Sequence, residues 1–388
     1  MILLLILIAT IAQISTDLYL PALPELTHYF GSSIGAVQFT LTSFVAGLVI
    51  SSLIYGMISE GIGRKKTLII GLSITLAGAL LCFFAKDIRM LQIGRFIQGC
   101  GAGACTGLWR SILRDNYSGK EMAKMGGTLS NLMIFSVVAA PFLGGYLSQY
   151  FGWRADFKFL SNYTLLVLII ISLFFKETGK HHHVDRLKIK FILTTYLEIL
   201  KSKLFIGCAL ASLFTYGAVF TWIMQSPIIL IHSAGLSPVS FGHLTLLTGL
   251  IIFLGNSVNK RLLDHFSGDT LLQAGWTIML FAGSMLLLGH FYFEPRFWFI
   301  VTFLPALILI FGASFVWTSI TAKAFFPFGH IAGYAGGLYS SIQILGGVIF
   351  GSILAKMNSE TQLPASLLIL SSIILAWLSF RLLAYKKI

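Results

Sequence analysis

Charged residues are scarce in this chain. Asp, Glu, Lys and Arg make up 11% of its 388 residues, whereas ordinary soluble domains carry about 25%. Acids are the rarer sign, with 14 Asp and Glu against 27 Lys and Arg, while 56% of the residues are hydrophobic. An ordinary soluble fold is therefore excluded, because the chain lacks the polar residues that its surface would need.

Residues that would indicate catalysis, metal binding or nucleotide hydrolysis are also few. The four cysteines lie in apolar stretches without a histidine at metal-ligand spacing, so we interpret them as packing residues. The glycine-rich GCGAGACTG at 99–107 is apolar and no lysine follows it, which argues against an ATP-driven pump. The run His181, His182 and His183 lies in a charged segment and is more typical of a solvated loop than of a metal site. We expect neither an enzyme nor a bound cofactor or metal.

Long apolar stretches recur over the whole chain. A helix needs about 20 apolar residues to cross the ~30 Å hydrocarbon core, and the strands of membrane barrels alternate instead of being apolar on all sides. The sequence therefore predicts an all-α membrane protein with twelve transmembrane helices. The first stretch has no basic start or small-residue cleavage site, so we expect it to be retained as a helix. The expected spans are 2–24, 36–58, 67–85, 90–109, 125–149, 159–175, 204–223, 240–258, 270–290, 297–318, 331–353 and 364–384.

The basic residues are divided unevenly between the two sides that these spans define. With both termini in the cytoplasm, 20 of the 27 Lys and Arg fall in cytoplasmic segments or at the cytoplasmic end of a span. This is the positive-inside pattern, so the net charge of +13 reports topology and not nucleic-acid binding. We expect a multi-pass protein of a bacterial inner membrane. Arg95 lies within a span, and the six on the opposite side are Lys86, Arg89, Arg154, Lys158, Arg296 and Lys356.

The spans form two groups of six, separated by the longest polar segment of the chain, at 176–203. Two six-helix halves with a cytoplasmic linker are typical of transporters built from internal repeats, whose substrate binds between the halves. We expect two pseudo-symmetric six-helix bundles, at 1–176 and 203–388, joined by a linker at 177–202. We expect the protein to function as a monomer.

The stretch YGMISEGIGRKK at 55–66 concentrates charge in the loop after the second span. Its glycines allow a tight reversal and its bases remain at the headgroup level. The loop after the eighth span begins with the similar GNSVNKRLLD at 255–264. The first loop resembles the signature G-x-x-x-D-x-x-G-R-K/R of the major facilitator superfamily. Glu60 replaces the family's aspartate and Gly61 stands where the family often has a base, so the resemblance implies an altered charge network. The matching residues are Gly56, Gly63, Arg64 and Lys65.

Further stretches resemble the same superfamily and, within it, the Bcr/CflA-type multidrug-resistance branch. TDLYLPALPEL at 16–26 resembles the branch's first-helix motif, and GRFIQGCGAG at 94–103 its fourth-helix motif with an embedded arginine. APFLGGYL at 140–147 resembles the fifth-helix motif of the antiporters, and IAGYAGGL at 331–338 the branch's eleventh helix. The resemblance implies the major facilitator fold and export of small molecules in exchange for protons. The further conformational residues that it implies are Arg114, Asp115, Pro141, Gly144 and Gly145.

Two ionisable residues inside the spans are candidates for proton coupling. Ionisable side chains within a membrane are expensive and functional by default. At ~1.5 Å per residue, Asp17 lies ~24 Å along the first helix. This depth in the membrane is similar to that of Arg95, near the outer end of the fourth helix. In the resembling family both helices line the central cavity. We expect Asp17 to pair with Arg95 or to exchange a proton against substrate. The alternative is that Asp17 caps or snorkels to the outer interface, because Pro21 and Pro24 follow it.

A cavity for small molecules combines aromatic surface with a few polar groups. Several residues within the spans have this character, and for each of them the alternative is core packing or an interfacial aromatic belt. The candidates for substrate binding are Tyr19, Tyr216, Gln225, Trp317, Tyr339 and Gln343.

These features together predict a proton-coupled secondary transporter that exports drugs or similar amphipathic compounds by alternating access. The alternative is a dedicated transporter of one metabolite, such as a siderophore or an amino acid. The acid Asp17 favours cationic substrates, but its neutralisation by Arg95 allows neutral or zwitterionic ones as well.

Overall fold

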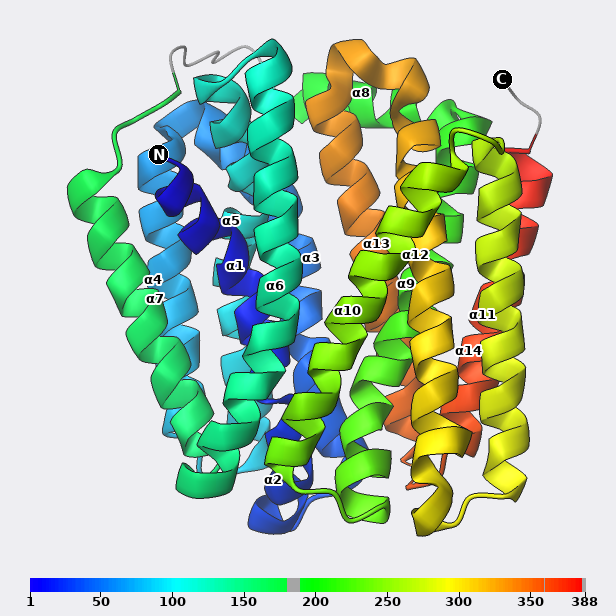
Figure 1. Ribbon diagram of the computed structural model, residues 1–388. Coiled ribbons are helices and arrows are strands. Elements are labelled where there is room, and N and C mark those ends of the chain that lie inside the picture. The colour runs from blue at the N-terminus through cyan, green and yellow to red at the C-terminus, as the bar shows by residue number, and fades with distance from the viewer. Residues whose placement is uncertain (180–188, 359, 386–388) are drawn as a thin grey trace. The chain divides into compact units, whose positions relative to one another are not determined.

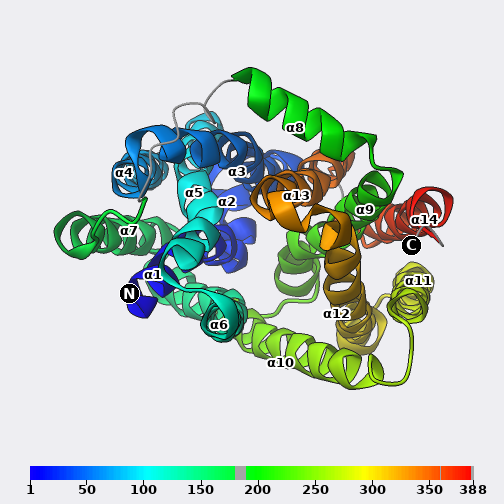
Figure 2. The same cartoon turned by 90° about the horizontal axis from the view of Figure 1, so that it is seen from above.

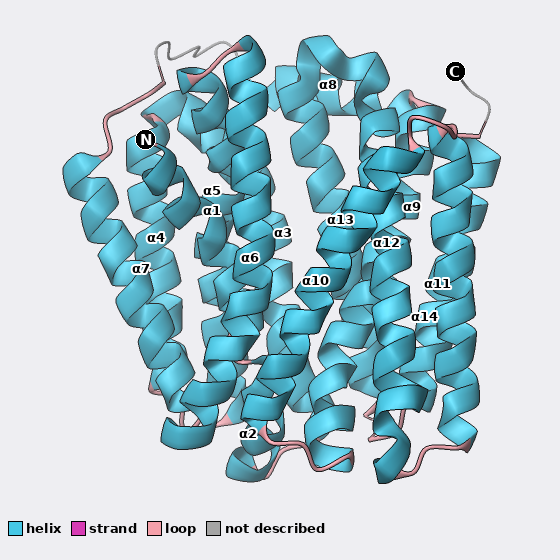
Figure 3. Ribbon diagram, viewed as in Figure 1, coloured by secondary structure: helices cyan, strands magenta, loops and turns pink. Residues whose placement is uncertain are grey.

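The computed structural model describes residues 1–179, 189–358 and 360–385, which fold into helices joined by short loops (Figure 3). No strand occurs in these residues. Twelve long helical segments correspond one to one with the twelve predicted spans, so the all-α membrane fold class is confirmed. Most run several residues beyond the predicted bounds, because a helix continues into the headgroup region after its apolar stretch has ended.

The described helices form two compact units (Figure 1). The N-terminal unit contains residues 1–32 and 40–195. In it α4 packs along α5 and α7, and α1 packs against α5 and α6. Its elements are α1 (Ile2–Asp17), the 3-10 helix η1 (Leu20–Ala22), α2 (Leu23–Phe30), α3 (Ile34–Ile62), α4 (Arg64–Phe83), α5 (Ile88–Asn116), α6 (Gly119–Phe151) and α7 (Arg154–Phe174).

The C-terminal unit contains residues 33–39, which begin helix α3, and residues 196–388. Part of the packing scheme of the N-terminal unit recurs here: α11 packs along α12 and α14, and α9 packs against α12 and α13. Helix α9 also packs extensively along α14. Its elements are α9 (Lys203–Pro227), η3 (Ile228–Ser233), α10 (Pro238–Leu262), α11 (Gly268–Phe291), η4 (Pro295–Phe297), η5 (Phe299–Phe303), α12 (Leu304–Phe325), η6 (Phe326–Ile331), α13 (Ala332–Met357) and α14 (Leu363–Leu383).

In the described part of the segment predicted as a linker, residues 177–179 and 189–202, the chain forms the helix α8 (Ile189–Lys201). It is seen lengthwise in Figure 2, unlike the long helix α9 that follows it. Residues 180–188, which include the histidine run at 181–183, lie outside the described part of the chain.

Eleven helical segments of the described residues are long and apolar enough to cross a membrane. Helix α5 is not among them, because it carries Arg95 and Arg110 along 29 residues that are rich in glycine. Large apolar side chains remain exposed along the helices, including Phe135, Leu173 and Phe253. Such exposure is expected where the solvent is lipid hydrocarbon, and it is unusual on a water-soluble monomer.

Candidate functional site

Arg95 is the centre of a buried polar site in the N-terminal unit. It lies on α5 and none of it is exposed. Its Nη1 donates hydrogen bonds to the backbone oxygen of Ser15 at 2.8 Å and to Gln98 Oε1 at 2.6 Å. Its guanidinium lies 4.3 Å from the ring centres of both Tyr19 and Phe44. Arg95 therefore holds a permanent positive charge where α1, α3 and α5 meet, stabilised by a carbonyl, an amide and two aromatic faces.

Asp17 lies beside this arginine at the C-terminal end of α1, with 4% of its surface exposed. Its carboxylate accepts a hydrogen bond from the Gln13 amide one turn earlier. Asp17 and Arg95 interact electrostatically, but the described residues show no ion pair or hydrogen bond between the two side chains. The direct pair, one of the two expected arrangements, is therefore not formed here. The carboxyl is left bonded to a neutral amide within the field of a cation.

The first span breaks directly after Asp17 and then continues. Pro21 and Pro24 do not end it, because each occupies one of the first two positions of a new helix, η1 or α2, where proline is tolerated. Helix α6 approaches this break closely at Gly144, where a β-carbon would collide with the backbone oxygen of Leu18. Gly144 of the fifth-helix motif thus allows α6 to pack against the backbone next to Asp17.

Three of the candidate substrate residues have their polar groups engaged within their own unit. The Tyr19 hydroxyl lies 3.0 Å from the Thr40 hydroxyl. The Gln225 amide accepts from Gln38 at 2.8 Å and donates to the backbone oxygen of Thr361 at 3.1 Å. The third, Tyr339, is 2% exposed and shares a hydrogen bond with a threonine of α12.

The other three candidates are partly exposed and lie on α9, α12 and α13 of the C-terminal unit. The ring of Tyr216 stacks on Phe220 at 5.9 Å between centres. The indole N–H of Trp317 is buried and has no acceptor among the described residues. Gln343 lies on α13.

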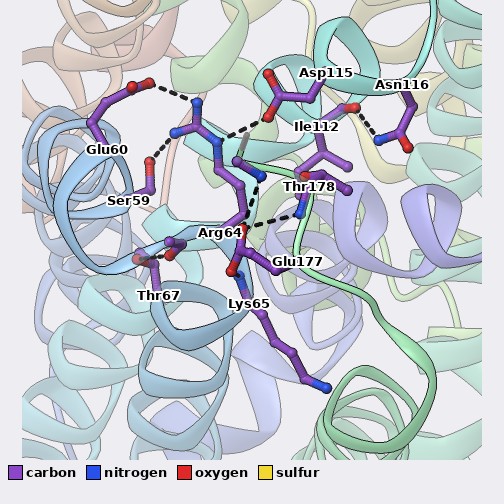
Figure 4. A network of polar contacts seen from close by, with 12 residues as sticks. Ser59, Glu60, Arg64, Lys65, Thr67, Ile112, Asp115, Asn116, Glu177 and Thr178 are labelled. Atoms are coloured by element: carbon purple, nitrogen blue, oxygen red, sulfur yellow. Dashed lines mark hydrogen bonds and ion pairs between the residues drawn. The ribbon is translucent and has the colours of Figure 1, made fainter. Parts of the chain in front are cut away.

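A second polar site lies where α3 ends and α4 begins (Figure 4). Arg64 has 4% of its side chain exposed and forms ion pairs with Glu60, at 2.6 Å, and with Asp115 on α5, at 3.2 Å. It also donates to the Ser59 hydroxyl. This arginine therefore connects three helices, and Glu60 occupies the place of the signature's aspartate. Gly56 has open space around it, and Arg114, beside Asp115, is exposed.

Glu177, which sequence reasoning missed, completes this site. Its carboxylate accepts hydrogen bonds from the backbone N–H groups of Arg64 at 2.9 Å and Lys65 at 3.0 Å, the first two residues of α4, and from Thr178 and Gly179. Partial burial acts to raise the pKa of Glu177, but these four donors prevail and lower it. Gly63 has a φ of 93°, and any side chain there would collide with this carboxylate. The positive φ thus requires glycine at this position, and the Glu177 carboxylate fills the space beside it.

The C-terminal unit also has an ion pair between the start of one helix and the end of the next. The acid and the base have exchanged helices relative to the Arg64–Asp115 pair. Lys323, near the end of α12, contacts both carboxylate oxygens of Asp269, in the first turn of α11, at 2.6 and 2.7 Å. In the N-terminal unit the cation begins α4 and the acid ends α5. The sequence contains a signal for this pair, since Asp269 and Arg64 each follow the glycine at the start of a helix, in GDTLL and GRKKTL.

No group of histidine, cysteine, aspartate and glutamate that could hold a metal occurs among the residues that the structure describes. The four cysteines are free, and three of them are buried.

The chain is similar to known proteins over most of its length. Residues 5–351 match the profile of the Major Facilitator Superfamily. The chain is 25% identical over 379 residues to the "Bicyclomycin resistance protein homolog" of Haemophilus influenzae, covering 96% of this chain and 93% of that protein. It is also 25% identical to "Multidrug resistance protein D" of Escherichia coli, covering 97% and 95%. A solved structure of the xylose transporter XylE from E. coli superposes with a TM-score of 0.73 at 16% identity, covering 98% and 96%.

Proposed function

Because the chain belongs to the Major Facilitator Superfamily, a family of transporters and not of enzymes, we propose that it exports amphipathic small molecules, drugs among them, in exchange for protons. The names of its bicyclomycin-resistance and multidrug-resistance relatives support this substrate class. In this proposal the protein is a monomer whose bundles, at 1–176 and 203–388, alternate access to the two sides of the membrane, with residues 177–202 as their linker.

The orientation follows from charge. Both termini and the linker lie in the cytoplasm, because that placement puts 20 of the 27 basic residues on the cytoplasmic side of a bacterial inner membrane. The end of the N-terminal unit that holds Arg64, Asp115 and Glu177 is then cytoplasmic. The end at which α2 meets α7 faces outward.

The observation that carries the proton-coupling proposal is the burial of Asp17 next to Arg95. A buried carboxylate is expensive unless it is paired and hydrogen-bonded, and the guanidinium offsets part of that expense. Asp17 receives one hydrogen bond from an amide and no direct ion pair, so small changes in its surroundings move its proton equilibrium. Substrate that enters from the cytoplasm displaces the proton from Asp17. After the substrate has left, the proton gradient drives a proton from the outer solution back onto Asp17.

We assign substrate recognition to groups that lack a hydrogen-bond partner among the described residues or that are partly exposed. The indole N–H of Trp317, which has no acceptor among the described residues, is a donor. The partly exposed Tyr216 and Gln343 offer an aromatic face and an amide in the C-terminal unit. Tyr19, Gln225 and Tyr339 have engaged polar groups, so in this proposal they shape the site and its surroundings.

The test is proton release from acidified inside-out vesicles when a panel of drugs is added. Substrate-evoked release in the wild type that is lost in Asp17→Asn and kept in Asp17→Glu supports antiport through this carboxyl. Release that survives in Asp17→Asn places the proton on another group. If no drug evokes release from correctly inserted protein, the panel is extended to siderophores and amino acids, and a response confined to one of them indicates a dedicated metabolite transporter.

A further inference from the structure

A second buried carboxyl lies in the N-terminal unit, outside the Arg95 site. Asp156 is in the first turn of α7 and none of it is exposed. Neither of its carboxylate oxygens has a hydrogen-bond partner among the described residues. Buried polar groups are nearly always bonded, so a fully buried acid with two unpartnered oxygens requires an explanation.

The charged group that acts on Asp156 is another acid. Glu25, on α2, is exposed to solvent, and one of its oxygens accepts the backbone N–H of Trp153 at 3.0 Å. Its negative charge interacts with Asp156 across the contact between α2 and the start of α7. His28, one turn further along α2, is exposed. The two carboxyls therefore form a pair in which one is in contact with water and the other is not.

Two cations lie two residues from Asp156 along the chain: Lys158 is exposed, and Arg154 does not neutralise the buried acid. The Arg154 guanidinium donates to the backbone oxygens of Phe83, at 3.3 Å, and Ala85, at 3.0 Å. Its face lies over the rings of Tyr29 and Trp153, at 4.8 and 4.2 Å from their centres. These contacts hold Arg154 in place, and no ion pair joins it to either acid among the described residues.

An ionised Asp156 would have neither a hydrogen bond nor a counter-ion among the described residues in a site that is closed to the solvent. Isolated charges are not tolerated in such places, and the group takes up a proton instead. When two carboxyls interact, their protons bind to the pair and not to one residue alone. Glu25 reaches water and Asp156 does not, so within the pair Glu25 is the group that meets the solvent.

We propose that Glu25 and Asp156 form a second proton-binding site, which takes protons from the outer solution and works together with Asp17. This inference rests on the proposed proton coupling and orientation. It gives the carrier a proton-binding group at the outward end of the N-terminal unit, separate from the group that senses substrate.

The first measurement is infrared difference spectroscopy of the purified protein during a pH titration, which detects the carbonyl stretch of a neutral carboxylic acid. We expect a band that is lost in Asp156→Asn and kept in Asp156→Glu. Glu25→Gln retains an acceptor for the Trp153 N–H but removes the neighbouring charge, so the pH range over which the band titrates should change. Asp264→Asn, at an exposed acid, is the matched control and should leave the band unchanged. A wild-type protein without an Asp156 band overturns the proposal.

The second measurement is the rate of substrate export as a function of outer pH in vesicles. Asp156→Asn should lose the increase in rate that outer acidification produces, while Asp264→Asn keeps it. An Asp156→Asn profile that superimposes on the wild type overturns the proposal, because the buried acid would then hold its proton throughout the cycle. If the rate of wild-type export does not depend on the proton gradient, the proposed antiport is wrong. The infrared titration then still decides whether the pair of Glu25 and Asp156 binds a proton.

Discussion

The carboxylate of Glu177 caps helix α4, and its removal tests how the signature loop is built. It accepts both the Arg64 and the Lys65 backbone N–H groups, which have no acceptor within their own helix. Replacing an N-terminal capping side chain by alanine costs about 0.5–2 kcal/mol. Glu177 is exposed, so water reaches the freed N–H groups, and we expect about 1 kcal/mol for Glu177→Ala.

The variant Glu177→Gln separates the hydrogen bonds from the charge. Its amide keeps a carbonyl acceptor and loses only the negative charge, which at a helix N-terminus is worth about 0.3–1 kcal/mol. We therefore expect it to lose about half as much stability as Glu177→Ala. A change of 1 kcal/mol shifts the melting temperature of a domain of 150–250 residues by about 2–4 °C, which thermal unfolding in detergent resolves.

The effect of Glu177 must also depend on pH, because the backbone donors lower its pKa. A glutamate whose pKa is lower in the folded state stabilises the fold above the unfolded pKa of about 4.3. That contribution to stability is lost as the pH falls through the pKa that Glu177 has in the folded state. The difference between the wild type and Glu177→Gln should thus be constant from pH 8 to about pH 5 and disappear in more acidic solution.

The matched control is Glu198→Gln, at an exposed glutamate on α8. It should leave the melting temperature unchanged at every pH. If Glu177→Ala melts with the wild type, or if the difference between the wild type and Glu177→Gln grows on acidification, the capping role is wrong.

Three further predictions concern packing and charge. Gly144→Ala should destabilise the protein by about 1–3 kcal/mol, because its β-carbon would collide with a backbone oxygen. Gly127→Ala, in open space on the same helix, should not destabilise it. Equal melting temperatures of the two variants would contradict the close approach. Arg95→Lys keeps the charge but loses the flat guanidinium between two rings, and we expect a loss of about 2 kcal/mol in thermal unfolding together with slower export; unchanged stability would refute this. Reversing one charge of the ion pair, in Asp269→Lys or Lys323→Asp, should destabilise the C-terminal unit. The double variant should recover part of the lost stability, with a coupling energy of about 0.5–3 kcal/mol in a double-mutant cycle. Losses of stability that simply add would show that the pair is not coupled.

The sequence determined the membrane class, the twelve helices and the position of Arg95 inside one of them. These are local properties, because hydrocarbon thickness sets the length of a span and a helix satisfies its own backbone hydrogen bonds. A contact across one turn was equally accessible: Glu60 and Arg64 are four residues apart, and the tight turn at Gly63 between α3 and α4 is enough to bring them together. Motifs such as APFLGGYL identified where a close approach was needed without naming the partner helix.

Only the tertiary structure decided which groups meet. Glu177 contacts Arg64 across 113 residues, and Asp115 does so across 51. Asp17 is bonded to Gln13 although Arg95 lies near it, and neither oxygen of Asp156 has a hydrogen-bond partner among the described residues. The physical reason is that all faces of these helices are apolar, so hydrophobic periodicity does not fix how each helix is rotated about its axis. That rotation is set by the close packing of small residues and by the few buried polar groups, and it is what brings distant charges together or keeps them apart.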